Sequence, residues 1–379
     1  MPARFAVIDV LRRFLPPWLK TKLPLSPPQR RAIWALTHCR TAALGGYRYD
    51  CQSCGHQHFA FHSCNHKACP QCGGAATVKW VRREQRKLVN APYFLVTFTL
   101  PAELRGLFFG PQAKEAYDLF FAAVSGALSE KLATDKGLCA AIHGFTAVLH
   151  TWNQQLGFHP HIHCVVPGVG LNARGQLVRV KNPEFLVYLK PLQAAFRQLF
   201  YRRLKERNWP VDPIVWDKQW GVHIQAAGSG RSALKYLGTY VARTAINDAR
   251  LVNVTDSSVT FHWKNRDQGN RRETATISGV EFVARYLRHV LPRGLRSIRY
   301  YGFGHPAAKA NRMRVQFHTG LAVEFGAQSP PADVPSQVPR CAGCGNPMHL
   351  RLRLIAVYKE RGPPPAKLTT APTTPSLAA

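Results

Sequence analysis

The stretch from Phe158 to Pro167 reads FHPHIHCVVP, with three histidines at every second position. Alternate residues of a β-strand point to the same face, so His159, His161 and His163 would share one face. Nearest same-face neighbours lie about 6.6 Å apart and can bind one metal ion together, whereas the outer two lie about 13 Å apart. Pro160 is typical of the start or edge of a strand. We therefore predict that His161 and His163 bind a metal ion; the alternative is a polar strand face that is merely rich in histidine.

A second stretch suited to chemistry contains Tyr236 and Tyr240, four residues apart, with Lys235 and Arg243 beside them. A glycine-rich loop followed by helix-forming residues predicts a helix from Ser232 onward, on which the two tyrosines share a face. Tyrosines at this spacing are more often packing groups than nucleophiles. Their cationic neighbours and the predicted metal site nevertheless favour a nucleophilic role.

Together these residues predict phosphoryl transfer. A phenol with a pKa near about 10 is a poor nucleophile at neutral pH, so an ion held by the histidines would have to polarise the phosphate and position it in line. The product would be a covalent phosphotyrosine, and two phenols would allow two successive transfers. A regular duplex would hinder this geometry, so a single-stranded substrate is expected. Two histidines do not complete a coordination shell, and the candidates for a third ligand are His150, Gln154, Gln155 and His159.

The chain has ten cysteines, which in an intracellular protein are more naturally metal ligands than disulfides. Two CxxC pairs separated by fourteen residues are typical of a zinc site and predict one structural zinc ion held by Cys51, Cys54, Cys69 and Cys72. With all four positions filled by protein, such an ion would stabilise a fold and would not catalyse a reaction.

Several other potential ligands are left open. Near the two pairs, a replacement ligand or a second site could come from Cys39, His58, Cys64 and His66, which are otherwise ordinary small or surface residues. Far along the chain, Cys341 and Cys344 form half of a similar site, for which His349 or another cysteine is the candidate partner.

The chain carries 51 lysines and arginines against 20 aspartates and glutamates, a net charge of +31. Such an excess favours a polyanionic partner, so we predict DNA binding. The candidate contacts, which are otherwise solvated basic faces, are Lys79, Arg82, Arg83, Lys235, Arg243, Arg285 and Arg288. No stretch approaches about 18 apolar residues and no signal peptide is recognisable. These features predict a cytoplasmic, nucleoid-associated protein with no membrane partner.

Apolar segments and amphipathic stretches predict an α+β fold with a mainly antiparallel sheet and flanking helices, preceded by a small zinc-knuckle domain. The expected strands are 93–100, 141–151, the histidine stretch, 220–226 and a hairpin of 259–263 with 273–278; the expected helices include 103–132, 191–208 and 281–291. The predicted domains are an N-terminal helical segment (1–45), a zinc-binding DNA-contact domain (46–90), a catalytic domain (91–310) and a C-terminal extension (311–379). The extension combines a proline-rich linker, the last CxxC pair and a disordered tail. No oligomeric state is predicted.

The sequence resembles a known family, the two-tyrosine HUH single-strand endonucleases, and more specifically the rolling-circle insertion-sequence transposases of bacteria. The likeness rests on His161-Ile162-His163 followed by Tyr236-x3-Tyr240, with further blocks at 39–72, 150–167 and 281–303 in the order that the family has. It implies an HUH-type catalytic domain, a zinc-binding N-terminal region, transposition through the single-stranded or hairpin ends of an element, a 5′-phosphotyrosine intermediate and a magnesium or manganese ion. Thr239 departs from the family pattern, which has a basic residue before the second tyrosine.

Two other functions are compatible with these residues. A rolling-circle replication initiator or relaxase would share the nicking chemistry, although the N-terminal cysteines and the later blocks disfavour it. A non-catalytic zinc-dependent DNA-binding protein would explain the cysteines and the charge, but not the coexistence of the histidine strand and the tyrosine pair.

Overall fold

A computed structural model describes residues 5–136, 138–218, 220–241, 245–265, 268–320 and 338–356, without the side chains of 73–76, 235–237 and 239–241. The chain forms two compact units. The described part of the large unit lies within 5–23 and 67–320, apart from 137, 219, 242–244 and 266–267, and that of the small unit is 24–66 and 338–356. This division differs from the domain boundaries predicted at residues 45, 90 and 310, because the chain leaves the large unit after its first helix and the C-terminal strand returns to the small unit. Residues 326–337 of the proline-rich linker predicted at 326–340, and the whole of the disordered tail predicted at 362–379, lie outside the described residues.

The large unit is built on an antiparallel sheet. Its five described strands lie in the order β12-β4-β5-β3-β8. Their bounds are β3 Pro92–Thr99, β4 Gly144–Trp152, β5 Phe158–Pro167, β8 Gly221–Ser229 and β12 Ile298–Gly302. Every neighbouring pair in this sheet is antiparallel. Helices flank the sheet, so the predicted α+β fold with a mainly antiparallel sheet is confirmed.

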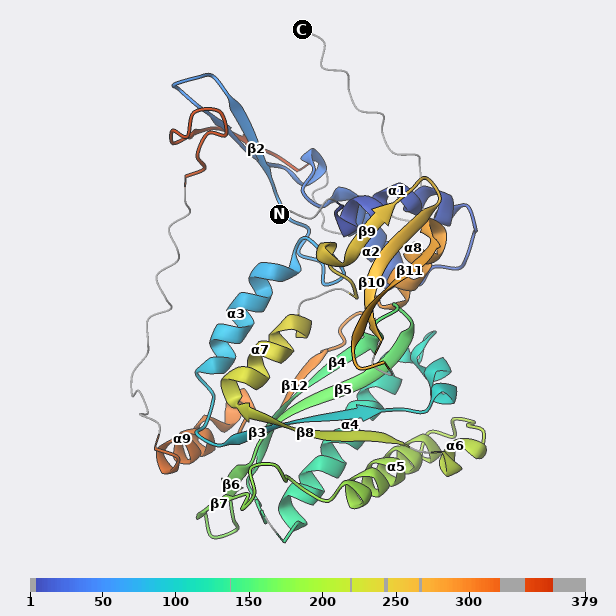
Figure 1. Cartoon of the computed structure of the whole chain (residues 1–379), viewed down its shortest axis with the longest axis vertical. Helices are drawn as coiled ribbons and strands as arrows, with labels where there is room; N and C mark the ends of the chain where they lie inside the picture. The colour runs from blue at the N-terminus through green and yellow to red at the C-terminus, as the bar shows by residue number, and fades with distance from the viewer. Residues whose placement is uncertain are drawn as a thin grey trace. The chain divides into compact units, whose positions relative to one another are not determined.

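Helices cover the two faces of this sheet in pairs (Figure 1). On one face α4 (Ala113–Thr134) and α5 (Leu189–Lys205) form the main core with Ile162 and other alternate residues of the strands. On the other face lie α3 (Gly73–Gln85) and α7 (Gly230–Val241), which pack against each other. The strict alternation of β5 therefore sends its histidines toward the α3 and α7 face.

The first helix of the large unit packs against a helix from much later in the sequence. Helix α1 (Val7–Leu19) packs against α8 (Gly279–Arg288), which follows the sheet β11-β10-β9. The remaining elements of this unit are β6 Val169–Leu171, β7 Leu177–Arg179, β9 Leu251–Val254, β10 Ser258–Asn265, β11 Arg271–Ser278, α6 Ile214–Asp217, α9 Lys309–His318, and the short 3-10 helices η2 Ala102–Phe108, η3 Asp248–Arg250 and η4 Pro306–Ala308. No helix in the described ranges is long and apolar enough to cross a membrane.

The small unit combines a helix with a three-stranded sheet. Helix α2 (Pro27–His38) begins at a capping box, in which Ser26 and Gln29 exchange hydrogen bonds, and η1 (Ala42–Leu44) follows it. The sheet has the order β13-β1-β2, with β1 Gly46–Asp50, β2 Gln57–Phe61 and β13 His349–Leu354. The C-terminal strand β13 is thus an edge of a sheet whose other strands come from near the N-terminus.

Candidate metal centres and tyrosine helix

Three histidines from the neighbouring strands β4 and β5 form one group. The antiparallel register sets His150 of β4 opposite His161 of β5, and His163 follows on the same face. The ring centroids of His150 lie 5.2 Å from those of His161 and 4.6 Å from those of His163, and the last two rings are 4.8 Å apart. One potential ligand nitrogen from each ring lies within 4.8 Å of the others. Of the third ligands considered, the structure therefore brings His150 to the predicted pair.

Hydrogen bonds orient two rings of this histidine group. Nδ1 of His161 donates to the main-chain carbonyl of His159 over 2.7 Å, since a carbonyl can only accept. This leaves Nε2 of His161 with the lone pair that a metal ion requires. Nδ1 of His163 lies 2.8 Å from the hydroxyl oxygen of Thr97 on β3. Such contacts fix the direction in which an imidazole presents its ligand nitrogen.

His150 is 1% exposed. Burial, with smaller effects of His163 and His161, holds the pKa of His150 well below its usual value. The ring is therefore neutral at neutral pH, and neutral imidazole is the form that binds metals. Three imidazoles on one sheet face can hold a divalent cation and leave coordination positions for another group.

The other third-ligand candidates lie outside this histidine group. Nδ1 of His159 accepts a hydrogen bond of 2.9 Å from the guanidinium of Arg105. Gln154 and Gln155 belong to the turn between β4 and β5, where their main-chain carbonyls are hydrogen-bond acceptors. The contacts with the two carbonyls anchor the backbone of this turn.

The turn before β5 is held by three side chains that sequence reasoning missed as positioning residues. Arg250 donates to the carbonyl of Gln154, Arg285 to that of Gln155 over 3.0 Å, and His289 to that of Leu156 over 3.1 Å. Burial lowers the pKa of Arg250 to about 10 and that of His289 to about 4. Three consecutive carbonyls are thereby fixed by residues 96, 130 and 133 positions further along the chain. No local sequence pattern could predict these contacts.

The predicted tyrosine helix exists as α7 and lies on the histidine face of the sheet. Its residues Ala233 and Leu234 are buried with Val148 and Val165. Val148 is paired with His163 across β4 and β5. Val165 follows His163 by two positions and shares its face.

Helix α7 is also fitted against α3. A Cβ on Gly238 would lie 2.4 Å from Cγ2 of Val81, so glycine allows the two helices to approach. The side chains of Lys235, Tyr236 and Tyr240, and the whole of residue 243, lie outside the described part of the chain.

The predicted DNA contacts of α3 and α8 differ in their surroundings. Lys79 and Arg82 of α3 and Arg288 of α8 are exposed. Arg83 is 3.2 Å from the buried carboxylate of Glu84 and donates to the hydroxyl of Tyr300. Arg285 pairs with Glu281 over 2.8 Å in addition to its contact with the turn.

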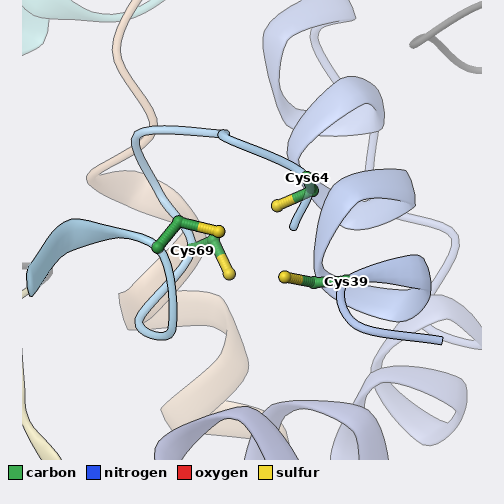
Figure 2. A group of neighbouring side chains, drawn as sticks. Cys39, Cys64 and Cys69 are labelled. Carbon is green, nitrogen blue, oxygen red and sulfur yellow. The ribbon is translucent and has the colours of Figure 1, made fainter. Parts of the chain in front are cut away.

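The cysteines form two groups, and neither is the predicted set of Cys51, Cys54, Cys69 and Cys72. One group is Cys39, Cys64, Cys69 and Cys72, and the other is Cys51, Cys54, Cys341 and Cys344; in each, the sulfurs lie within 4.8 Å of one another. Figure 2 shows the sulfurs of Cys39, Cys64 and Cys69 directed toward one another.

The β1–β2 hairpin explains why the predicted grouping is wrong. Its first CxxC pair, Cys51 and Cys54, forms the tip of the hairpin, whereas Cys39 and Cys64 flank its opposite end, where the amide of Arg40 donates to the carbonyl of His62. The five residues of β2 carry the chain about 16 Å away from the tip. Spacing along the sequence could not reveal this separation. Of the two alternative ligands that the sequence leaves open, Cys64 belongs to one of the two cysteine groups, whereas His66 belongs to neither group.

Comparisons with known proteins agree with this organisation. Residues 10–100 match a family model described as a transposase zinc-binding domain, and residues 144–312 match one described as a putative transposase. The chain is 36% identical to a putative transposase, y4qJ, of Sinorhizobium fredii, over 88% of this chain and 87% of the relative. It is 28% identical to the transposase for insertion sequence element IS801 of Pseudomonas savastanoi pv. phaseolicola, over 70% of this chain and 67% of the relative. The chain therefore belongs to the family of insertion-sequence transposases that carry an N-terminal zinc-binding domain of the IS91 type.

Proposed function

We propose that this transposase nicks and rejoins single-stranded DNA at the ends of its insertion sequence through a covalent 5′-phosphotyrosine, and so drives rolling-circle transposition. The observation that carries the proposal is the shared sheet face of the histidine group and the tyrosine helix. Helix α7 is seated on this face by Ala233 and Leu234, beside the strand residues that follow His163. Positions 233, 236 and 240 are three and four residues apart and therefore follow one side of the helix.

Tyr236 and Tyr240 are the proposed nucleophiles. The phenolic oxygen of one attacks the scissile phosphorus, the bond from phosphorus to the 3′ oxygen breaks, and that oxygen leaves as a 3′-hydroxyl with the proton balance met by solvent. The 5′ phosphate stays on the tyrosine, which keeps the phosphodiester energy available for rejoining. A second phenol allows a second strand to be attacked before the first is released.

The proposed metal ligands are His150, His161 and His163. A divalent ion bound there would supply Lewis-acid polarisation of the scissile phosphate and hold it in place. Of the two ions that the resemblance implies, manganese suits three imidazole nitrogens better than magnesium, which prefers oxygen ligands. The histidines themselves are oriented by the His159 carbonyl and by Thr97, so the ligand nitrogens are arranged before an ion arrives.

We also propose that Cys39, Cys64, Cys69 and Cys72 hold the structural zinc of the matched N-terminal domain. All four cysteines lie within residues 10–100, and their sulfurs are close enough to share one ion. Tetrahedral thiolate ligation is the usual arrangement of a structural zinc site, and it contributes directly to folding.

DNA is held in this proposal by exposed basic side chains of the large unit. Lys79, Arg82 and Arg288 are exposed and can contact phosphates, and the net charge of +31 favours the encounter. Base-pairing hinders in-line approach of a phenol and a histidine-held ion to one phosphate, which is why single-stranded or hairpin ends are the proposed substrate.

The test is adduct formation with single-stranded oligonucleotides from the ends of the element, labelled at the 3′ end so that the label stays with the 5′-phosphotyrosine. Wild-type protein with Mn²⁺ should give a labelled protein band in denaturing gels, and EDTA should abolish it. The Tyr236→Phe, Tyr240→Phe double variant should give no labelled protein band. The control variant Tyr188→Phe changes an exposed tyrosine directly before α5 and should give the same band as wild type. A normal adduct yield from the double variant would overturn the assignment of nucleophiles.

The histidines are tested in the same assay. His161→Ala and His163→Ala should each remove the adduct at all Mn²⁺ concentrations that wild type uses, whereas His159→Ala should retain it. Full adduct formation by His163→Ala would show that the histidine group is not the metal site of the reaction.

A further inference from the structure

The two CxxC pairs of the small unit have the same backbone geometry. In the first, the amide of Cys51 donates to the carbonyl of His56 over 2.9 Å, and that of Gly55 to the carbonyl of Cys51 over 2.9 Å. In the second, the amide of Cys341 donates to the carbonyl of Asn346 over 2.8 Å, and that of Gly345 to the carbonyl of Cys341 over 2.9 Å. The two glycines have φ values of 73° and 74°. Both pairs therefore form turns of one kind, called knuckles below, although they lie nearly three hundred residues apart in the sequence.

The sulfurs of the two knuckles meet. Sγ of Cys51 lies 3.4 Å from that of Cys344, and Sγ of Cys54 lies 3.4 Å from that of Cys341. A tetrahedral zinc ion with Zn–S bonds of about 2.3 Å separates its sulfurs by about 3.8 Å, whereas a disulfide needs about 2.05 Å. Four sulfurs within 4.8 Å of one another thus fit a shared ion and no disulfide.

The protein around these sulfurs supports the same arrangement. Cys51 and Cys341 are 2% and 3% exposed and pack with Met348 and Tyr49. Asn346 beside the second knuckle donates to the hydroxyl of Ser53 in the first over 2.9 Å.

Strand pairing continues the contact beyond the knuckles. The strand after the second knuckle, β13, pairs with β1 from Asp50 with His349 to Gly46 with Leu354, with one shift of register between Arg48 and Tyr49. Nonlocal pairs of this kind are entropically costly to bring together and need a compensating interaction.

We propose that Cys51, Cys54, Cys341 and Cys344 bind a second structural zinc ion, which fastens residues 338–354 to the N-terminal zinc-binding region. The matched zinc-binding family model ends at residue 100 and so contains only half of these ligands. The site makes the C-terminal segment part of the small unit, and it is independent of the proposed nicking chemistry.

The test is the zinc content of the purified full-length protein, measured by inductively coupled plasma mass spectrometry. Wild type should hold two zinc ions per chain and the Cys344→Ser variant one. Cys344→His should hold two, because imidazole can replace a thiolate in a zinc site. Cys139→Ser, a change to an exposed cysteine outside both groups, should hold two.

Cobalt substitution separates loss of a site from loss of fold. The thiolate-to-cobalt absorption per chain should fall by about half in Cys344→Ser while circular dichroism is retained. Amide exchange of β13 should become faster in this variant and stay slow in Cys344→His. A Cys341→Ser, Cys344→Ser double variant that holds as many zinc ions per chain as wild type would overturn the proposal.

Discussion

The imidazole of His289 donates a hydrogen bond to the main-chain carbonyl of Leu156, with 3.1 Å between Nε2 and the oxygen. Leu156 adopts a left-handed conformation with φ of 63° in the turn that leads into the histidine strand. The second ring nitrogen of His289 lies 3.2 Å from the hydroxyl oxygen of Thr151 on β4. A residue at the end of α8 therefore ties together the end of β4 and the start of β5, the two strands that carry the histidine group.

This buried histidine makes stability depend on pH. Burial lowers the pKa of His289 to about 4, whereas an unfolded histidine titrates near about 6.5. Above about pH 6.5 the histidine is unprotonated in both the folded and the unfolded state, so it does not change the free energy of unfolding. Between about pH 6.5 and pH 4 only the unfolded state binds the proton, so the free energy of unfolding falls by about 1.4 kcal/mol for each unit by which the pH is lowered. We expect wild type to lose about 1.4 kcal/mol more than His289→Gln between pH 7.5 and pH 5.5, measured by urea unfolding. Equal losses in both proteins would contradict this role.

Two arginines of α8, three residues apart, should differ in what they do. Arg285 is held by Glu281 and donates to the Gln155 carbonyl, so Arg285→Ala should lower the free energy of unfolding by about 1–3 kcal/mol. Arg288 is exposed, so Arg288→Ala should leave stability within about 0.5 kcal/mol. It should instead weaken binding of single-stranded DNA and reduce the slope of log K against log salt by about 0.7. Fluorescence anisotropy over a salt series, with urea unfolding in parallel, checks both expectations. If Arg285→Ala weakened DNA binding and Arg288→Ala lowered the stability, Arg285 would be the phosphate contact.

Sequence alone can predict those strands and hairpins whose residues are close to one another along the chain. The period of two from residue 159 to 163 predicts a strand with same-face histidines, and β5 has this alternation, with Ile162 in the opposite core. Alternation also predicts the hairpin that forms β10 and β11, which pair along their whole length. These features depend on neighbours within a few residues.

The composition of the histidine and cysteine groups depends on the register in which strands pair and on residues far apart in the sequence. His150 joins the histidine group only because β4 pairs with β5 so that residue 150 faces residue 161. Cys51 lies beside Cys344, which is 293 residues away, and nothing in the spacing of the N-terminal cysteines excludes the nearer pair at 69 and 72. Local spacing predicts that a cysteine binds metal, but only the course of the strands determines which cysteines share an ion.

Gly238 lies within the tyrosine helix α7, although glycine has a low helix propensity, because a larger residue there would clash with α3. Alanine at position 238 would favour the helix by up to about 1 kcal/mol, but its Cβ would lie 2.4 Å from Cγ2 of Val81 on α3. Because the clash involves a β-branched side chain, we expect Gly238→Ala to destabilise the protein by about 1–3 kcal/mol. Adding Val81→Ala should recover most of this loss by removing the clashing methyl group. Thermal unfolding of the single and double variants measures both effects, and a Gly238→Ala protein as stable as wild type would mean that α7 can move away from α3.

The hydroxyl of Thr97 should tune metal binding without being a ligand. It lies 2.8 Å from Nδ1 of His163, so Nε2 is the nitrogen of this ring that we propose as the metal ligand. Removing such a contact usually costs about 10-fold to 100-fold in metal affinity, because the ring loses its fixed orientation. Thr97→Val should therefore raise the Mn²⁺ concentration needed for half-maximal adduct formation by about 10-fold and leave the yield at saturating Mn²⁺ close to wild type. Thr99→Val makes the same chemical change two positions along β3 and should leave both quantities unchanged. If Thr97→Val required no additional Mn²⁺, or if Thr99→Val required as much as Thr97→Val, the contact with His163 would not be what orients the ring.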